Sequence, residues 1–82
     1  MTSKKISIAI LGSTGSVGKT ALDIIKKNTD KFSVDLLSCN KNKKLIIQQI
    51  NLFQPKYVLV SNKNLFLNLK KIKIKRKVVI YN

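Results

Sequence analysis

The sequence predicts an α/β fold in which strands and helices alternate along one small domain. Short apolar runs, typical of buried strands, recur along the chain, and the segments between them carry apolar residues at helical spacing. All three glycines of the chain lie together, directly after the first apolar run. Strands that alternate with helices favour a parallel sheet with right-handed crossovers, so we expect the order β-α-β-α-β-α-β.

The amino-terminal part predicts a strand, a helix and a second strand. Residues 6–11 (ISIAIL) form an apolar run with little polar alternation, as in a strand buried within a parallel sheet. A helical pattern runs from Val17 to about Lys27 and ends at Asn28-Thr29-Asp30. The residues expected on its buried face are Val17, Ala21, Ile24 and Ile25. Residues 32–39 are the second predicted strand.

The carboxyl-terminal part repeats the alternation. Residues 44–53 have helical spacing, and Pro55 ends that connection because proline cannot continue a helix. Residues 57–60 predict a third strand. Ser61 and Asn62 can cap a short helix that runs to about residue 70. Residues 72–81 predict the last strand.

Several side chains of these elements are expected in the core. Cys39, at the end of the second predicted strand, is expected to be a small buried apolar residue. The larger expected core residues are Ile46, Ile50, Phe53, Tyr57, Leu65, Phe66 and Leu69.

A glycine-rich segment lies between the first strand and the first helix. Its residues are Gly12, Ser13, Thr14, Gly15, Ser16, Val17 and Gly18. Glycines let the backbone turn sharply and approach a pyrophosphate without an intervening Cβ, and the free N–H groups at a helix start bind phosphate oxygens. Thr14 and Ser16 add hydroxyl donors. We therefore predict a Rossmann-type nucleotide-binding domain with the cofactor phosphate at residues 12–18; a tight turn without a ligand is the alternative.

A P-loop is a second alternative for the same residues. Gly18-Lys19-Thr20 is similar to the end of the pattern G-x-x-x-x-G-K-[ST]. That pattern requires glycine at position 13, where this chain has Ser13. The acidic residues of the chain are Asp23, Asp30 and Asp35, and none follows a later strand as a metal-binding aspartate would.

The end of the second predicted strand distinguishes NAD from NADP. NAD-binding folds place an acidic residue there to bind the ribose 2′-hydroxyl, whereas NADP-binding folds provide a basic environment. Asp35 lies within the strand and not at its tip, where Lys41 and Lys43 stand without a carboxylate. This favours NADPH over NADH, although both lysines could also be ordinary solvated loop residues.

The composition limits the other function classes. Lys and Arg number 17 against three acidic residues, a formal net charge of +14, which is compatible with a polyanion partner. The lysines are spread along a chain rich in Lys, Asn and Ile, so we favour compositional drift and expect no specific nucleic-acid partner. A basic remnant that binds polyanions nonspecifically stays as an alternative.

The residue types and segments that the chain lacks exclude several kinds of catalytic site and a membrane location. With one cysteine and no histidine, the chain has no disulfide framework, no Ser-His or Cys-His catalysis and few possible zinc sites. No apolar run approaches the length of a membrane span, and residues 1–11 do not form a signal peptide. We therefore expect no membrane partner and a cytoplasmic location.

These residues together resemble the amino terminus of the 1-deoxy-D-xylulose 5-phosphate reductoisomerase family. The likeness covers positions 5–60 well and positions 61–82 only in the order of elements. The matching residues are the segment ILGSTGSVG at 10–18, Leu22-Asp23, Asn28, Phe32, Val34, Lys41-Asn42, Gln49, Phe53 and PKYV at 55–58.

The resemblance implies an NADPH-dependent oxidoreductase of the non-mevalonate route to isoprenoids. Such enzymes rearrange and reduce 1-deoxy-D-xylulose 5-phosphate to 2-C-methyl-D-erythritol 4-phosphate, use a divalent metal (Mg or Mn) and form homodimers. The cofactor-contacting family positions that match are Thr14, Gly15, Ser16, Val17, Lys41 and Asn42. Asn40, where the family more often has glycine, completes the predicted site.

The resemblance also implies what these 82 residues lack. The metal-binding carboxylates, the substrate-phosphate site and the mobile lid of the family lie beyond the segment seen here. We therefore expect residues 1–82 to be a partial NADPH-binding domain, the first part of a larger one, that is inactive alone. No catalytic and no metal-binding residue is assigned in this chain, and the substrate would bind only with the missing domains.

Overall fold

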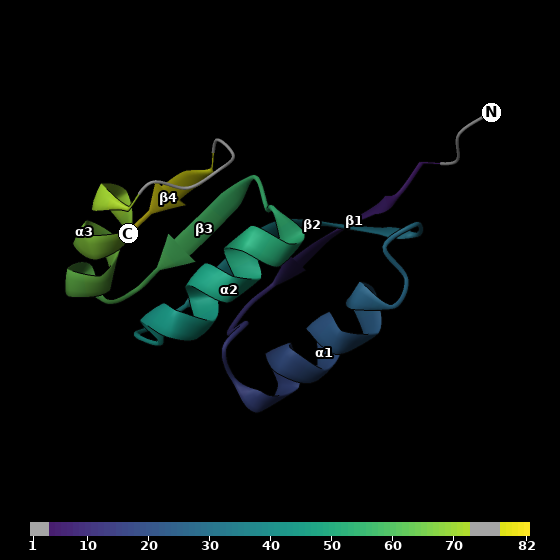
Figure 1. Cartoon of the computed structure of the whole chain (residues 1–82), viewed down its shortest axis with the longest axis horizontal. Coiled ribbons are helices and arrows are strands. Elements are labelled where there is room, and N and C mark those ends of the chain that lie inside the picture. The colour runs from purple at the N-terminus through teal and green to yellow at the C-terminus, as the bar shows by residue number, and fades with distance from the viewer. Residues whose placement is uncertain (1–3, 73–77) are drawn as a thin grey trace.

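The computed structural model describes residues 4–72 and 78–82 and confirms the predicted order of elements (Figure 1). The elements are β1 (Ile6–Ile10), α1 (Ser16–Lys26), β2 (Phe32–Cys39), α2 (Lys43–Phe53), β3 (Tyr57–Val60), α3 (Lys63–Lys71) and β4 (Val79–Tyr81). Most boundaries agree with the sequence to within a residue. The last strand is shorter than predicted: β4 begins at Val79, Ile72 directly follows α3, and residues 73–77 lie outside the described residues.

The four strands form one parallel sheet in the order β1-β2-β3-β4. Each crossover therefore advances in the same direction across the sheet, and right-handed connections then place all three helices on one face. Figure 1 shows α1 and α2 side by side across the sheet, with α3 next to β4. The fold is a Rossmann-like α/β arrangement, as predicted.

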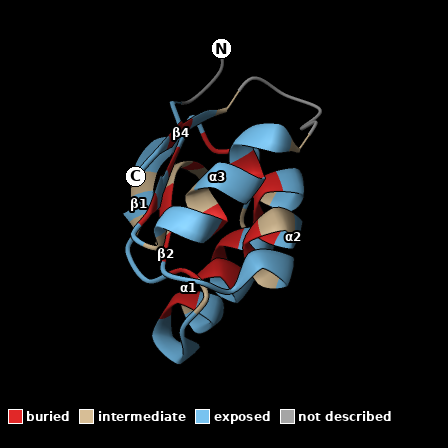
Figure 2. Cartoon of the chain, turned by 90° about the vertical axis from the view of Figure 1, so that its left-hand side faces the viewer, coloured by how far each residue is buried: buried red, intermediate tan, exposed pale blue. Residues whose placement is uncertain are grey.

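The core lies between the sheet and the helices (Figure 2). Its buried apolar residues are Leu22, Ile25, Val34, Leu37, Cys39, Ile46, Ile50, Val58, Val60, Leu65, Leu69 and Ile80. The prediction for Cys39 is confirmed, since its side chain is only 6% exposed. Phe53 and Phe66 are partly buried and pack against this cluster.

The buried face of α1 differs from the predicted one. Val17 is 85% exposed and Ile24 is 57% exposed, so the prediction was wrong for these two residues. Ile25 is buried as predicted, and the other buried residues of α1 are Gly18 and Leu22. The predicted stripe begins at Val17 and the observed one at Gly18, so the helix is turned about its axis by one residue relative to the prediction. Gly18 decides between them, because the lack of a side chain there lets the helix lie directly against the preceding turn.

Tyr57 is also a wrong core prediction, since it is 41% exposed. It lies on the sheet face opposite the helices, where its ring is 6.1 Å from that of Tyr81, centroid to centroid. Leu59 and Val79 are likewise exposed. This face of the sheet carries no helix among the described residues.

A bulge in β2 determines where Asp35 lies. Ile8 pairs with Val34 and Ala9 pairs with Leu36, so Asp35 is the extra residue of the longer strand. Its carboxylate accepts a hydrogen bond from the Ser33 hydroxyl at 3.1 Å. Asp35 is therefore held within the strand, as predicted, and does not stand at the strand tip.

Candidate functional site

The glycine-rich loop is hydrogen-bonded to the tip of β2. Gly12 adopts φ +67°, a left-handed conformation that glycine takes without strain. Its N–H donates to Ser38 Oγ at 2.9 Å, and the N–H of Ser13 donates to the Ser38 carbonyl at 2.7 Å. Gly15 N–H then donates to the Gly12 carbonyl at 3.0 Å and closes the turn. The loop and the end of β2 are thus one connected unit.

Gly18 fixes how closely α1 packs against this loop. A Cβ at Gly18 would lie 2.7 Å from Ser13 Cα and would also overlap the Gly12 carbonyl. A Cβ at Gly15 would meet only the Gly12 oxygen, at an ordinary 3.4 Å. Packing within the chain therefore requires glycine at position 18 but not at position 15.

The start of α1 is open toward solvent. Gly15 is the N-cap residue, no side chain caps the helix, and no acidic residue occupies the first turn. The first N–H groups of a helix have no partner within the helix, and the positive end of the helix dipole lies there. Ser16 and Val17 are exposed and Thr14 is half-buried. Such a terminus is suited to a phosphate group.

Ser13 differs from its neighbours in the loop because it is fully buried. Its carbonyl accepts a hydrogen bond from Gln49 Nε2 of α2 at 2.8 Å. Ser13 Oγ is buried without a partner among the described residues. Ser13 therefore supports the loop from inside, while Gly12, Gly15 and Ser16 form its exposed surface.

Gln49 matches the family in sequence, but sequence reasoning did not assign it to the site. It is only 6% exposed and lies on the buried face of α2 together with Ile46 and Ile50. An amide on an otherwise apolar face costs free energy unless it is hydrogen-bonded, so its position was a signal that it has a buried partner. The sequence could not identify Ser13 as that partner.

The other predicted residues follow the tip of β2. Asn40, Lys41 and Asn42 are exposed, directly after the strand that holds the loop through Ser38. Asn40 Oδ1 accepts from the Ser61 hydroxyl at 2.8 Å. Asn42 Oδ1 caps α2 by accepting from the Leu45 N–H at 3.1 Å. Both amide nitrogens remain potential donors toward an anion, and Lys41 adds a positive charge.

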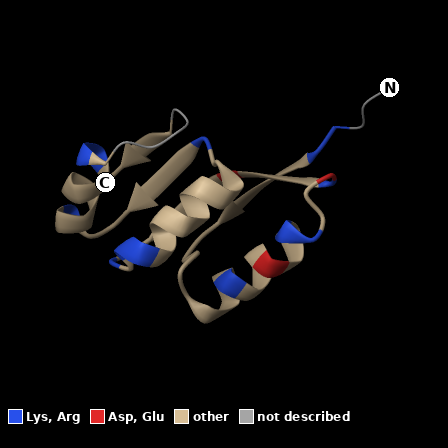
Figure 3. Cartoon of the chain, in the orientation of Figure 1, with Lys and Arg blue, Asp and Glu red and all other residues tan. Residues whose placement is uncertain are grey.

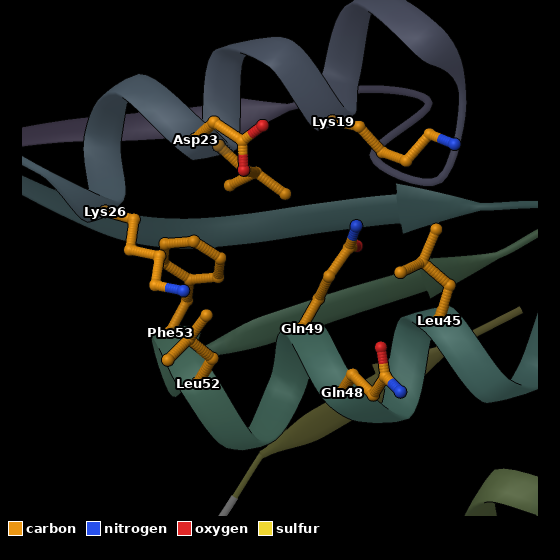
Figure 4. A pocket seen from close by; sticks show the side chains of 9 residues that line it. Lys19, Asp23, Lys26, Leu45, Gln48, Gln49, Leu52 and Phe53 are labelled. Atoms are coloured by element: carbon orange, nitrogen blue, oxygen red, sulfur yellow. The ribbon is translucent and has the colours of Figure 1, made fainter.

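A groove of about 210 Å³ lies between α1 and α2 (Figure 4). The residues that line it are Lys19, Leu22, Asp23, Lys26, Leu45, Gln48, Gln49, Leu52 and Phe53. Its apolar lining comes from leucines and Phe53, and its charged residues come from α1. Gln49 belongs both to this groove and to the support of the loop.

The P-loop alternative lacks geometric support. The Thr20 hydroxyl, which a P-loop would use to bind Mg²⁺, donates to the Ser16 carbonyl at 3.0 Å. Within residues 4–72 and 78–82, no three His, Cys, Asp or Glu side chains gather closely enough to hold a metal ion.

Burial raises the pKa of the Cys39 thiol, which therefore stays protonated at neutral pH and is a poor nucleophile. None of the described helices combines the length and the apolar character needed to cross a membrane.

Comparison with known sequences gives one consistent family. A sequence model of 1-deoxy-D-xylulose 5-phosphate reductoisomerase matches residues 8–81. The reductoisomerase of Pelagibacter ubique is 45% identical over 75 residues, which cover 92% of this chain and 19% of that protein. The one of Porphyromonas gingivalis is 50% identical over 58 residues, which cover 71% of this chain and 15% of that protein.

Solved structures agree with the sequence comparison. The Zymomonas mobilis reductoisomerase in complex with NADPH superposes with a TM-score of 0.87 at 27% identity, covering 95% of this chain and 21% of that one. A DOX-P reductoisomerase in complex with magnesium shares the fold, with a TM-score of 0.82 at 22% identity over 96% of this chain and 20% of that one. This chain thus spans about a fifth or less of the length of these relatives.

Proposed function

Because this chain belongs to the 1-deoxy-D-xylulose 5-phosphate reductoisomerase family, we propose that it forms the amino-terminal NADPH-binding part of such an enzyme. The observation that supports this most strongly is the loop of residues 12–18, which turns from β1 into the uncapped start of α1. The same turn is fixed to the tip of β2, where the adenosine ribose of a dinucleotide binds in Rossmann-type folds.

Each part of the site has a distinct role in this proposal. The N–H groups of Ser16 and Val17 bind the cofactor diphosphate at the positive end of α1, and the Thr14 hydroxyl adds a donor. The Gly15 N–H is already bonded to the Gly12 carbonyl, so Gly15 contributes by letting the diphosphate approach without a side chain in the way. Lys41, with the amide nitrogens of Asn40 and Asn42, binds the ribose 2′-phosphate. Ser13 and Gly18 shape the loop from inside. Bound NADPH would supply the hydride for reduction.

The chemistry of the whole enzyme is proposed only for a longer protein. Rearrangement and reduction of 1-deoxy-D-xylulose 5-phosphate, the divalent metal and the homodimer are proposed for the whole enzyme, and this chain spans about a fifth or less of the length of its relatives. We expect this chain alone to bind cofactor and to be inactive. Its single cysteine, buried at the end of β2, suits a reducing compartment such as the cytoplasm.

Nonspecific polyanion binding is the competing function, because the net charge is +14. The lysines are distributed over several elements and are not gathered on one of them (Figure 3). Binding that depends on total charge weakens steeply as salt is added, whereas a built cofactor site loses less affinity.

The test is a thermal-shift titration with NADPH, NADH and a polyanion such as heparin, at low salt and at about 0.15 M salt. We expect NADPH to raise the melting temperature at both salt concentrations, and NADH to raise it much less. Equal shifts with all three ligands that disappear at the higher salt would establish nonspecific polyanion binding and refute the cofactor site.

A further inference from the structure

We propose that Gln49 is a positioning residue for the cofactor loop: its buried amide holds the Ser13 carbonyl and so sets where the phosphate-binding N–H groups of α1 lie. The proposal rests on the function proposed above. It concerns a residue of α2 that is distant in sequence from the loop and is not among the residues expected to touch the cofactor.

The contact between the two residues is buried and specific. Gln49 Nε2 donates to the Ser13 carbonyl at 2.8 Å across 36 residues of sequence. Ser13 is 0% exposed and Gln49 is 6% exposed, and they are the two buried polar residues of the described chain. Figure 4 shows Gln49 pointing from α2 into the space between α1 and α2. Gln49 Oε1 is buried without a partner among the described residues, so the bond from Nε2 to the Ser13 carbonyl is the interaction that offsets the cost of burying this amide.

Hydrogen bonds fix both sides of the Ser13 backbone. Its N–H donates to the Ser38 carbonyl at 2.7 Å, and its carbonyl accepts from Gln49. The N–H of Gly12 donates to Ser38 Oγ at 2.9 Å. The sheet therefore holds one side of the turn and α2 holds the other.

The Ser13 backbone packs directly against the start of α1, so a shift of Ser13 also shifts the first turn of the helix. A Cβ on Gly18 would lie only 2.7 Å from Ser13 Cα, so the first turn of α1 rests directly against the Ser13 backbone. If the Ser13 carbonyl loses its donor, this contact is the one that must shift. The exposed N–H groups of Ser16 and Val17 then move away from the place where the diphosphate binds.

The chemistry of the bond offers a sharp test. Gln49 acts as a donor, and a glutamate at the same position can donate only while it is protonated. The ionised carboxylate would face the Ser13 carbonyl oxygen in a buried site, so its ionisation would break the bond. The 2′-phosphate of NADPH itself changes charge at about pH 6, so the quantity to compare is the ratio of dissociation constants. The ratio of Gln49→Glu to the parent chain should rise as the pH rises.

Gln48→Glu is the matched control, because it makes the same change on the neighbouring residue, which is exposed on α2 and lines the same groove. The dissociation constant for NADPH is measured for the parent chain and both variants between about pH 5 and pH 8. At the upper pH we expect Gln49→Glu to bind about tenfold more weakly than Gln48→Glu. The difference should shrink as the pH falls.

Gln49→Met distinguishes a positioning role of Gln49 from a general contribution to stability, because it keeps the size of the side chain and removes the hydrogen-bond donor. We expect it to retain the circular dichroism and melting temperature of the parent chain within a few degrees while binding NADPH more weakly. This variant also decides the question if Gln49→Glu does not fold at the upper pH. NADPH affinity equal to that of the parent in the folded Gln49 variants would overturn the proposal.

Failure of the proposed function gives a different result. In that case the parent chain itself shows no salt-resistant NADPH binding. Amide hydrogen exchange without cofactor then decides the role of Gln49, since Gln49→Met should accelerate exchange in residues 13–18 and Gln48→Glu should not. Unchanged exchange in those residues would overturn the positioning role.

Discussion

Gly15 and Gly18 lie three residues apart in the same loop, but their surroundings differ. A Cβ at position 18 would overlap the backbone of Gly12 and Ser13, whereas one at position 15 meets only an ordinary contact. We predict that Gly18→Ala lowers the free energy of unfolding by about 1–3 kcal/mol through overpacking. Gly15→Ala should change it by less than about 0.5 kcal/mol. Urea unfolding measures both.

Cofactor binding should separate the same two variants in another way. Gly15 lies at the open start of α1, where the added methyl group would meet the diphosphate. We therefore expect Gly15→Ala to fold normally and to lose most of its NADPH affinity. A Gly15→Ala chain that binds NADPH like the parent would show that the diphosphate does not approach this residue.

In the proposed site, Lys41 supplies the single charge that would distinguish a 2′-phosphate from a 2′-hydroxyl. We predict that Lys41→Gln weakens NADPH binding by about tenfold and leaves NADH binding nearly unchanged, because only NADPH has the charged partner. Lys31→Gln is the control, since Lys31 precedes β2 and lies at the opposite end of that strand. Calorimetric titration gives both affinities. An equal loss in the two variants would mean that Lys41 acts only through net charge.

At the scale of elements, the sequence of α1 predicts that a helix forms but does not predict which of its apolar stripes is buried. The neighbouring stripes on this helix are both apolar, and the close contact at Gly18 selects the one with Leu22. We predict that Leu22→Ala costs about 2–5 kcal/mol of unfolding free energy, as for a buried leucine. Ile24→Ala should cost less than about 1 kcal/mol, because Ile24 is exposed. Urea unfolding compares the two, and a larger cost at Ile24 would contradict the observed packing.

Most of the element order could be predicted because local signals agree at each boundary. Asn42 and Asn62 cap α2 and α3, and Pro55 follows the end of α2. The face of α1 could not be predicted, because it depends on a contact between Gly18 and a turn that periodicity does not describe. The exposure of Tyr57 depends on which sheet face the helices cover, and this follows from the strand order and not from the strand itself.

Some parts of the candidate site could likewise be predicted from the sequence, and others could not. The loop and the basic tip of β2 could be predicted, because glycine spacing and missing acidic residues are local features of the sequence. The role of Ser38 and Gln49 could not, since each contacts the loop across more than 25 residues. The side-chain bonds of Asn40 to Ser61 and of Asn42 to Leu45 likewise became visible only in the structure.

At the scale of the whole molecule, the helices of residues 4–72 and 78–82 cover one face of the sheet and leave the other face open. Tyr57, Leu59, Val79 and Tyr81 are exposed on the other face, although parallel sheets are generally covered on both. The chain spans about a fifth or less of its relatives, and the net charge of +14 adds self-repulsion.

The most direct measurement is a map of backbone amide chemical shifts as NADPH is added at about 0.15 M salt. We expect the largest changes at Gly12, Gly15, Ser16, Val17 and Lys41, and nearly none in α3. NADH should produce the changes in the loop but smaller ones at Lys41. Changes that follow the lysines over the whole surface, or that leave residues 12–18 unaffected, would contradict a dinucleotide site at this loop.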